Sequence, residues 1–256
     1  MDGVLWRGTE PILDIVELVD RIKNQQHSFF FVTNNSTKTV KHHLSRFNKY
    51  GIAVLEDQVI TSAEAAAAYL GSKHPEGGFV YLVGESGLFD AMQKQNFSHI
   101  ENPDDHKILA VVAGLDREIS YLKIEQSARL IKRGAAFIGT NPDLTIPTPE
   151  GFSPGAGVII KAIEAASGKS AEIIGKPEAY LYTLALQRSE SFADEAIMIG
   201  DRLDTDIKGA QDQGIHTALV LSGVTDRLKA DAWEPRPDLI AKDALAILEK
   251  IGNHET

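Results

Sequence analysis

The sequence predicts an α/β fold built around a doubly wound parallel sheet. One observation is that short apolar runs of strand length alternate with longer segments whose apolar residues recur at helical spacing. A second is that polar turn residues follow most of these runs at once, as they do at strand ends. Because strands separated by helices indicate βαβ units, we expect the strands to pair in parallel.

The first third of the chain predicts three helices around one strand. Apolar residues at spacings of three and four indicate a helix over 12–22, and the run 29–32 is a strand candidate. A second helix is expected over 40–47. Thr61 and Glu64 have the form of a capping box, so a third, alanine-rich helix should begin there.

The middle third begins after a glycine pair at 77–78, which breaks the chain. Strands are predicted over 79–83, 108–113 and 135–138, and helices over 121–133 and 158–166. The segment 140–157 holds four prolines and three glycines, so we expect neither helix nor strand throughout it.

The last third returns to short runs that each end in a polar turn. Residues 173–174 lead into Gly175-Lys176-Pro177, and residues 196–199 lead into Gly200-Asp201. The run 217–221 leads into Ser222-Gly223, and helices are expected between the runs.

Composition excludes several classes of protein. The chain has 256 residues, 43% apolar and 24% charged, which is ordinary for a globular protein with a sizeable core. A net charge of −10 argues against nucleic acid or an anionic membrane as the main partner. The absence of cysteine excludes disulfides and thiolate chemistry and favours a cytoplasmic location. We find no apolar run of membrane-spanning length, so no membrane partner is expected.

Four polar positions follow the predicted strands and would meet at one edge of a parallel sheet. They are Asp2, on the condition that a strand precedes it, Thr33 with Asn34, Lys176, and Asp201. Two carboxylates can hold Mg²⁺, which prefers oxygen ligands. A hydroxyl, backbone N–H groups and an ammonium can hold phosphate oxygens. The set therefore predicts a site for a phosphoryl group and its metal.

Each of these positions also has a plain structural interpretation. Thr33 and its neighbours could cap a helix, Lys176 could be a solvated turn lysine, and the acidic turn at Asp201 could stabilise a helix N-terminus. The functional interpretation is favoured because all four positions follow strands, in one order along the chain.

These residues resemble the four signatures of the haloacid dehalogenase superfamily of phosphatases. Met1-Asp2-Gly3-Val4 is similar to the end of the first signature, Asp-x-Asp-Gly, and Thr33-Asn34-Asn35-Ser36 to the second. Gly175-Lys176-Pro177 and the acidic segment 200–206 match the third and the fourth. The resemblance points to the branch with NagD-type nucleotide, p-nitrophenyl, phosphoglycolate and pyridoxal phosphate phosphatases.

The resemblance implies a Rossmann-like core at residues 1–77 and 172–256, with its first strand missing, and an inserted α/β cap at 78–171. It also implies a Mg²⁺-dependent phosphoric monoester hydrolase that works through a phospho-aspartate. Its substrate would be a small phosphorylated metabolite. A homo-oligomer is compatible with the residues, which do not define the oligomeric state.

The resemblance further implies the role of each residue. Asp2 would act as general acid and base and offer its backbone carbonyl to the metal, and Asp201 would be the carboxylate ligand. Thr33 and the amides of Asn34 and Asn35 would hold phosphoryl oxygens, and Lys176 would neutralise their charge. The remaining residues are expected further out: Asp206 would steady the metal loop, and Asn141 and Asp143, in the cap loop 140–157, would contact the substrate.

The attacking aspartate of the family falls two positions before Asp2, upstream of Met1. We therefore expect the chain as written to be inactive, either because its start codon is assigned too late or because it is truly truncated. The alternative function is a non-catalytic, phospholigand-binding or regulatory protein. A redox or nucleotide-binding domain is a third hypothesis, but no Gly-x-Gly-x-x-Gly follows a strand.

Overall fold

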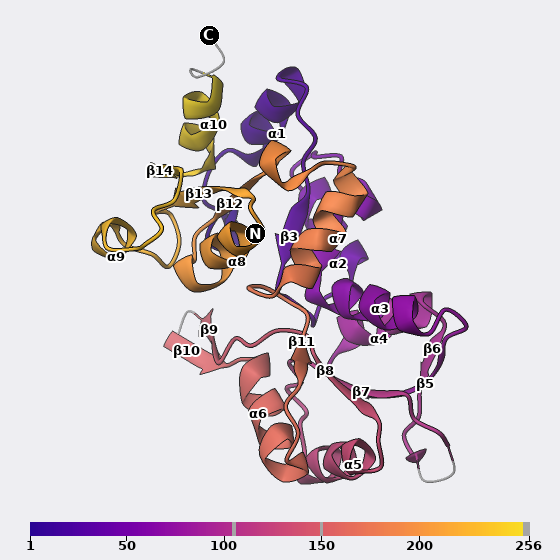
Figure 1. The fold of residues 1–256 in the computed structure, drawn as a ribbon. Coiled ribbons are helices and arrows are strands. Elements are labelled where there is room, and N and C mark those ends of the chain that lie inside the picture. Colours follow the sequence, from indigo (N-terminus) through magenta and orange to yellow (C-terminus); the bar gives the residue numbers. More distant parts are fainter. Residues whose placement is uncertain (104–105, 149–150, 253–256) are drawn as a thin grey trace. The chain divides into compact units, whose positions relative to one another are not determined.

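The computed structural model describes residues 1–103, 106–148 and 151–252, and it confirms the predicted α/β class (Figure 1). The chain divides into two compact units. The first contains residues 1–33, 44–59 and the chain from Tyr182 onward, and the second contains residues 34–43 and 60–181. The predicted division into a core and a cap, with boundaries at 77/78 and 171/172, stays a prediction.

The first unit is organised around a parallel sheet of three strands in the order β12-β13-β14. Helix α10 packs against β13 and β14, and α8 packs against β13. The strands of this unit are β1 (Trp6–Arg7), β2 (Glu10–Pro11), β3 (Phe31–Thr33), β12 (Ile197–Gly200), β13 (His216–Val220) and β14 (Leu239–Ala241). Its helices are α1 (Ile15–Asn24), α8 (Lys208–Asp212), α9 (Arg227–Asp231) and α10 (Ala244–Gly252), with a π-helical turn at Leu203–Ile207 and 3-10 turns at Glu56–Gln58 and Ala193–Glu195.

The second unit contains a parallel sheet of five strands in the order β11-β8-β7-β5-β6. Its strands are β5 (Gly78–Val83), β6 (Phe97–His99), β7 (Ala110–Ala113), β8 (Ala136–Gly139), β9 (Thr145–Thr148), β10 (Gly151–Pro154) and β11 (Glu172–Ile173). Its helices are α3 (Ser62–Lys73), α4 (Ser86–Lys94), α5 (Tyr121–Lys132) and α6 (Ala156–Ser167). Three elements each contain a boundary between the units: α2 (Val40–Asn48), β4 (Val59–Thr61) and α7 (Ala179–Ser189).

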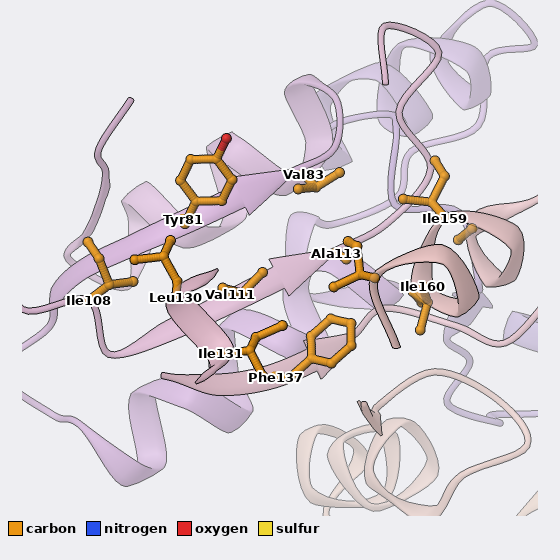
Figure 2. Close-up of a cluster of buried hydrophobic side chains, with 12 residues drawn as sticks. Tyr81, Val83, Ile108, Val111, Ala113, Leu130, Ile131, Phe137, Ile159 and Ile160 are labelled. Atoms are coloured by element: carbon orange, nitrogen blue, oxygen red, sulfur yellow. The ribbon is translucent and has the colours of Figure 1, made fainter. Parts of the chain in front are cut away.

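The core of the second unit lies where α5 and α6 cover strands β5, β7 and β8. Figure 2 shows Val111 of β7 and Phe137 of β8 among the side chains of Ile131 from α5 and Ile160 from α6. Ile160 and Val111 are buried almost completely. The strands that cross this core are nearly continuous apolar runs because a sheet covered by helices buries most of its side chains.

Local signals in the sequence place several elements correctly. The hydroxyl of Thr61 accepts a hydrogen bond from the N–H of Glu64, and Glu64 reaches back to Thr61, so the predicted capping box begins α3. The helices predicted over 121–133 and 158–166 are α5 and α6. Among the described residues, no helix has the length and the apolar composition that a membrane span requires.

The segment 140–157 is more regular than its prolines suggest. Strands β9 and β10 form an antiparallel hairpin within it, in which Thr145 pairs with Pro154. Each strand of an isolated hairpin has one edge without a partner strand. Proline is tolerated there because its missing N–H faces no neighbour. The composition therefore concealed these two short strands.

Candidate active site

Thr33, Lys176 and Asp201 lie at or after strand ends, whereas Asp2 precedes the first strand, and the structure corrects the expectation of a single sheet. Thr33 is the last residue of β3, and Asp201 comes directly after β12 in the first unit. Lys176 lies shortly after β11, which pairs with β8 in the sheet of the second unit. The strands that lead to Lys176 and to Asp201 thus belong to different sheets. That all four positions converge on one pocket stays a prediction.

Asp201 is a buried carboxylate in the first unit, with 4% of its surface exposed. Its Oδ2 accepts a hydrogen bond from the N–H of Val224 at 2.9 Å. A Cβ at Gly3 would lie 2.1 Å from this oxygen, and a Cβ at Gly223 would lie 2.0 Å from it. Real Cβ atoms do not approach that closely, so both positions require glycine for the carboxylate to occupy this place.

The Asp2–Gly3 turn is bound to the same loop. The hydroxyl of Ser222 donates to the carbonyl of Gly3 at 2.8 Å, and Arg7 donates to the carbonyl of Ser222 at 2.9 Å. Asp2 itself is exposed. The structure therefore brings two of the sequence-predicted positions, Asp2 and Asp201, to neighbouring turns of one unit.

The cationic side chain of Arg46 lies within the electrostatic reach of Asp2. The guanidinium of Arg46 lies over the ring of Trp6 at 3.9 Å and donates to the carbonyl of Gly8. Burial lowers the pKa of Arg46, and the negative charge of Asp2 acts in the opposite direction. The hairpin that follows Asp2 is thus held by a cation within the electrostatic reach of Asp2.

Asp206 makes the loop-steadying contact that the sequence predicts. One of its carboxylate oxygens accepts from the N–H groups of Asp201 at 3.1 Å and Arg202 at 3.2 Å. Asp206 lies in the π-helical turn, a rare geometry that often marks functional sites. The buried hydroxyl of Tyr182 donates to the carbonyls of Thr205 at 2.7 Å and Asp206 at 3.2 Å, and burial raises its pKa.

The oxygen groups of this unit fit a magnesium ion. The carboxylate of Asp201 and the backbone carbonyl of Asp2 are hard donors, and two protein donors leave room for the waters that Mg²⁺ keeps. Gly3 and Gly223 leave open the space that the Asp201 carboxylate occupies. No cluster of three or more His, Cys, Asp or Glu side chains with a metal-binding arrangement occurs within 1–103, 106–148 and 151–252.

In the second unit, the side chain of Asn34 joins three segments of chain. Its Nδ2 donates to the carbonyl of Lys176 at 2.9 Å and to a carboxylate oxygen of Asp143 at 3.1 Å. Its Oδ1 accepts from the N–H of Lys176 at 2.8 Å. Asn141 donates to the carbonyl of Asn34 at 2.8 Å. Four predicted residues of this unit, Asn34, Asn141, Asp143 and Lys176, therefore form one network.

Asn35 and Lys176 are also predicted site residues of the second unit. The Oδ1 of Asn35 accepts from the N–H groups of Thr37 at 3.0 Å and Lys38 at 2.9 Å, so its side chain shapes the turn. Lys176 is buried, with 6% of its surface exposed, and so is Thr33, with 5%. A buried ammonium and a buried hydroxyl are compatible with binding an anion, since neither is fully hydrated.

Sequence reasoning missed the uncharged residues that hold the site. Gly3 and Gly223 leave space for the carboxylate, and Tyr182 braces the π-helical turn. The run 217–221 indicated a strand end at Ser222-Gly223, but no charged residue drew attention to it. The alternation of strand runs and helical segments does not indicate a role for Tyr182, because it lies within a helix.

Comparisons with known proteins agree with these features. Residues 1–98 match the model of the haloacid dehalogenase-like hydrolase family, and residues 173–247 match a second model described as HAD-hydrolase-like. An acid sugar phosphatase from Staphylococcus epidermidis is 36% identical over 253 residues, which cover 98% of this chain and 96% of that one. A 5′-nucleotidase from Bacillus subtilis, YutF, is 34% identical over 228 residues, covering 89% of this chain and 87% of the relative.

Solved structures show the same likeness. A p-nitrophenyl phosphatase from Archaeoglobus fulgidus has a TM-score of 0.89 at 29% identity, covering 97% of this chain and 96% of that one. A glycerol phosphate phosphatase from Mycobacterium tuberculosis, in complex with magnesium, has a TM-score of 0.88 at 30% identity, covering 96% and 74%. The chain therefore belongs to the haloacid dehalogenase superfamily, in its branch of phosphoric monoester hydrolases that includes the NagD-type and p-nitrophenyl phosphatases.

Proposed function

We propose that this protein is a Mg²⁺-dependent phosphatase that hydrolyses small phosphate monoesters through a phospho-aspartate. The observation that supports it most is the carboxylate of Asp201, buried against Gly3 beside the exposed Asp2. Two carboxylates in neighbouring turns with different exposure suit two roles, one on a metal and one in proton transfer.

The mechanism assigns the attack to an aspartate two positions before Asp2. Its carboxylate oxygen forms a bond to phosphorus as the bond from phosphorus to the leaving oxygen breaks, and Asp2 donates its proton to that oxygen. Asp2 then removes a proton from water, which attacks phosphorus and releases the aspartate and inorganic phosphate. When bound, Mg²⁺ neutralises charge on the phosphoryl group.

The other residues act by positioning and charge, which is most of what phosphoryl transfer requires. Thr33 and the backbone amides of Asn34 and Asn35 hold phosphoryl oxygens, and Lys176 lies between nucleophile and phosphate. Asp201 and the carbonyl of Asp2 hold the metal. Residues 78–171 form the cap, whose segment 140–157 selects among sugar phosphates, nucleotides and other monoesters. We place the enzyme in the cytoplasm, since it has no cysteine.

The test is to assay p-nitrophenyl phosphate hydrolysis with Mg²⁺ and with EDTA. Two chains are compared: the 256-residue chain, and one extended upstream by an apolar strand segment ending in aspartate two positions before Asp2. We expect the extended chain to turn over only with Mg²⁺ and the short chain to be inactive. Comparable turnover by the short chain would contradict the assignment of the nucleophile. An extended chain that binds phosphate without turnover would favour the non-catalytic, phospholigand-binding alternative.

A further inference from the structure

The side chain of Asn34 uses both of its N–H donors inside the protein. A primary amide offers two N–H donors and one carbonyl oxygen. Here one N–H goes to the carbonyl of Lys176, the other goes to Asp143, and the oxygen accepts from the N–H of Lys176. This amide has no donor left for a phosphate oxygen, so its contribution to the site must pass through the groups that it holds.

The two bonds to Lys176 fix its backbone on both sides of the Cα atom. The same amide engages the N–H of Lys176 at 2.8 Å and its carbonyl at 2.9 Å. One position earlier, the N–H of Gly175 donates to the carbonyl of Thr140 at 2.9 Å. A Cβ at Gly175 would lie 2.8 Å from the Oδ1 of Asn34 and 2.3 Å from the carbonyl oxygen of Thr140, so the approach requires glycine. Because the backbone sets the direction of the Cα–Cβ bond, this network sets where the Lys176 side chain begins.

Asp143 determines which way the amide faces. An ionised carboxylate only accepts hydrogen bonds, so the NH₂ group of Asn34 must point toward it. The carbonyl oxygen of Asn34 is then directed at the N–H of Lys176, the one donor among its three partners. Asn141 adds a further bond, to the backbone carbonyl of Asn34.

We propose that Asn34 is a positioning residue whose side-chain amide fixes the backbone of Lys176 and so aims its ammonium at the phosphate, with Asp143 fixing the orientation of the amide. The role given to Lys176 rests on the proposed function, whereas the backbone contacts of Asn34 do not. The proposal changes how the side chains of Asn34 and Asp143 contribute, since both act on Lys176 and not directly on the substrate.

The first test is hydrogen exchange at the Lys176 amide, followed by NMR on the 256-residue chain. Asn34→Ala removes the acceptor of this N–H, so exchange should be faster by about tenfold or more. Asn48→Ala, at an exposed position at the end of α2, is the matched control and should leave it unchanged. Equal protection in Asn34→Ala and in the unsubstituted chain would overturn the proposal.

The second test is a double-mutant cycle on the binding of inorganic phosphate with Mg²⁺, measured by calorimetry. Asn34→Ala should weaken binding by about tenfold in the unsubstituted chain, because a misplaced group loses most of its effect. It should weaken binding less than about twofold when Lys176→Ala is already present, because the two residues act as one unit. Equal losses in both backgrounds would overturn the proposal.

Exchanging the amide and the carboxylate between positions 34 and 143 sharpens this test. Asn34→Asp places a second carboxylate against Asp143, so it should weaken phosphate binding more than Asn34→Ala does. Adding Asp143→Asn restores a donor and acceptor pair and should recover part of the loss. No recovery would contradict the role of Asp143. If the unsubstituted chain binds no phosphate, the proposed function fails, and the exchange experiment still decides whether Asn34 holds Lys176.

Discussion

In the first unit the carboxylate of Asp201 accepts a hydrogen bond from the N–H of Val224 and occupies space that Gly3 and Gly223 leave open. In the second unit the backbone of Lys176 is held by one amide side chain that joins three segments of chain. The position of the Asp201 carboxylate therefore depends on the close approach of Gly3 and Gly223. Alanine at either glycine would place a Cβ atom against the carboxylate. The basic half depends on directed hydrogen bonds, and it is disturbed when donors and acceptors change.

The difference follows from the ligand that each half is proposed to take. A metal requires oxygen atoms at fixed positions, and a buried carboxylate held by the N–H of Val224 provides one. A phosphate is bound by a cation and by hydrogen-bond donors that point at the same place. The fixed backbone of Lys176 defines the position from which its long side chain extends. Substitutions in the first unit should therefore change the response to magnesium, and those in the second should change phosphate binding.

The largest effect is expected from Asp201→Asn. The amide keeps the size of the carboxylate and can still accept from Val224, so the fold should remain. Loss of the charged ligand should weaken metal binding by more than about 100-fold, since loss of outer partners alone costs 10- to 100-fold. Binding of Mn²⁺, which takes the same oxygen ligands, measured by EPR in competition with Mg²⁺, checks this. Unchanged Mn²⁺ affinity would show that the metal lies elsewhere.

Asp206→Ala should have the next largest effect, on stability. It removes a buried acceptor of two backbone N–H groups, which should lower the free energy of unfolding by about 2 to 3 kcal/mol. Asp204, two residues earlier, forms an exposed pair with Arg202, so Asp204→Ala should cost less than about 0.5 kcal/mol. Urea denaturation of both variants measures the difference. Equal losses in the free energy of unfolding would contradict the different roles given to Asp204 and Asp206.

Gly3→Ala should reduce metal affinity by placing a Cβ against the Asp201 carboxylate. Gly8 is the matched control because it too has a positive φ, +59° against +78° at Gly3, but no atom lies within 4 Å of its added Cβ. Both substitutions should cost about 1 kcal/mol of backbone strain. The Mn²⁺ titration should distinguish the two variants, because only Gly3→Ala should lose Mn²⁺ affinity. An equal loss of Mn²⁺ affinity in both variants would show that backbone strain is the cause.

The smallest effect on metal affinity is expected from Tyr182→Phe, which removes the hydroxyl that donates to the carbonyls of Thr205 and Asp206. The free energy of unfolding should fall by about 1 to 2 kcal/mol. Metal affinity should fall slightly, because the turn also carries Asp206. Thermal unfolding with and without Mg²⁺ tests both effects. Full stability in Tyr182→Phe would show that the hydroxyl does not brace the turn.

The sequence predicts much of this architecture because strands, helices and caps follow local rules. The capping box at Thr61 and the apolar run of β7 depend only on neighbouring residues. The pairing of β11 with β8 in the sheet of the second unit could not be predicted, because pairing depends on residues far apart in the chain. The glycine contacts of Asp201 and the amide network of Asn34 were missed for the same reason: a glycine or an asparagine shows its role only through its distant neighbours.

The central claim is the proposed function, in which Asp201 binds a metal ion that takes part in phosphate binding. The most direct measurement is the dissociation constant of inorganic phosphate for the 256-residue chain, by calorimetry with and without Mg²⁺. If the proposed phosphatase binds metal and phosphate together, Mg²⁺ should tighten phosphate binding by about fivefold or more, and Asp201→Asn should abolish that gain. The same dissociation constant with and without Mg²⁺ would contradict the account.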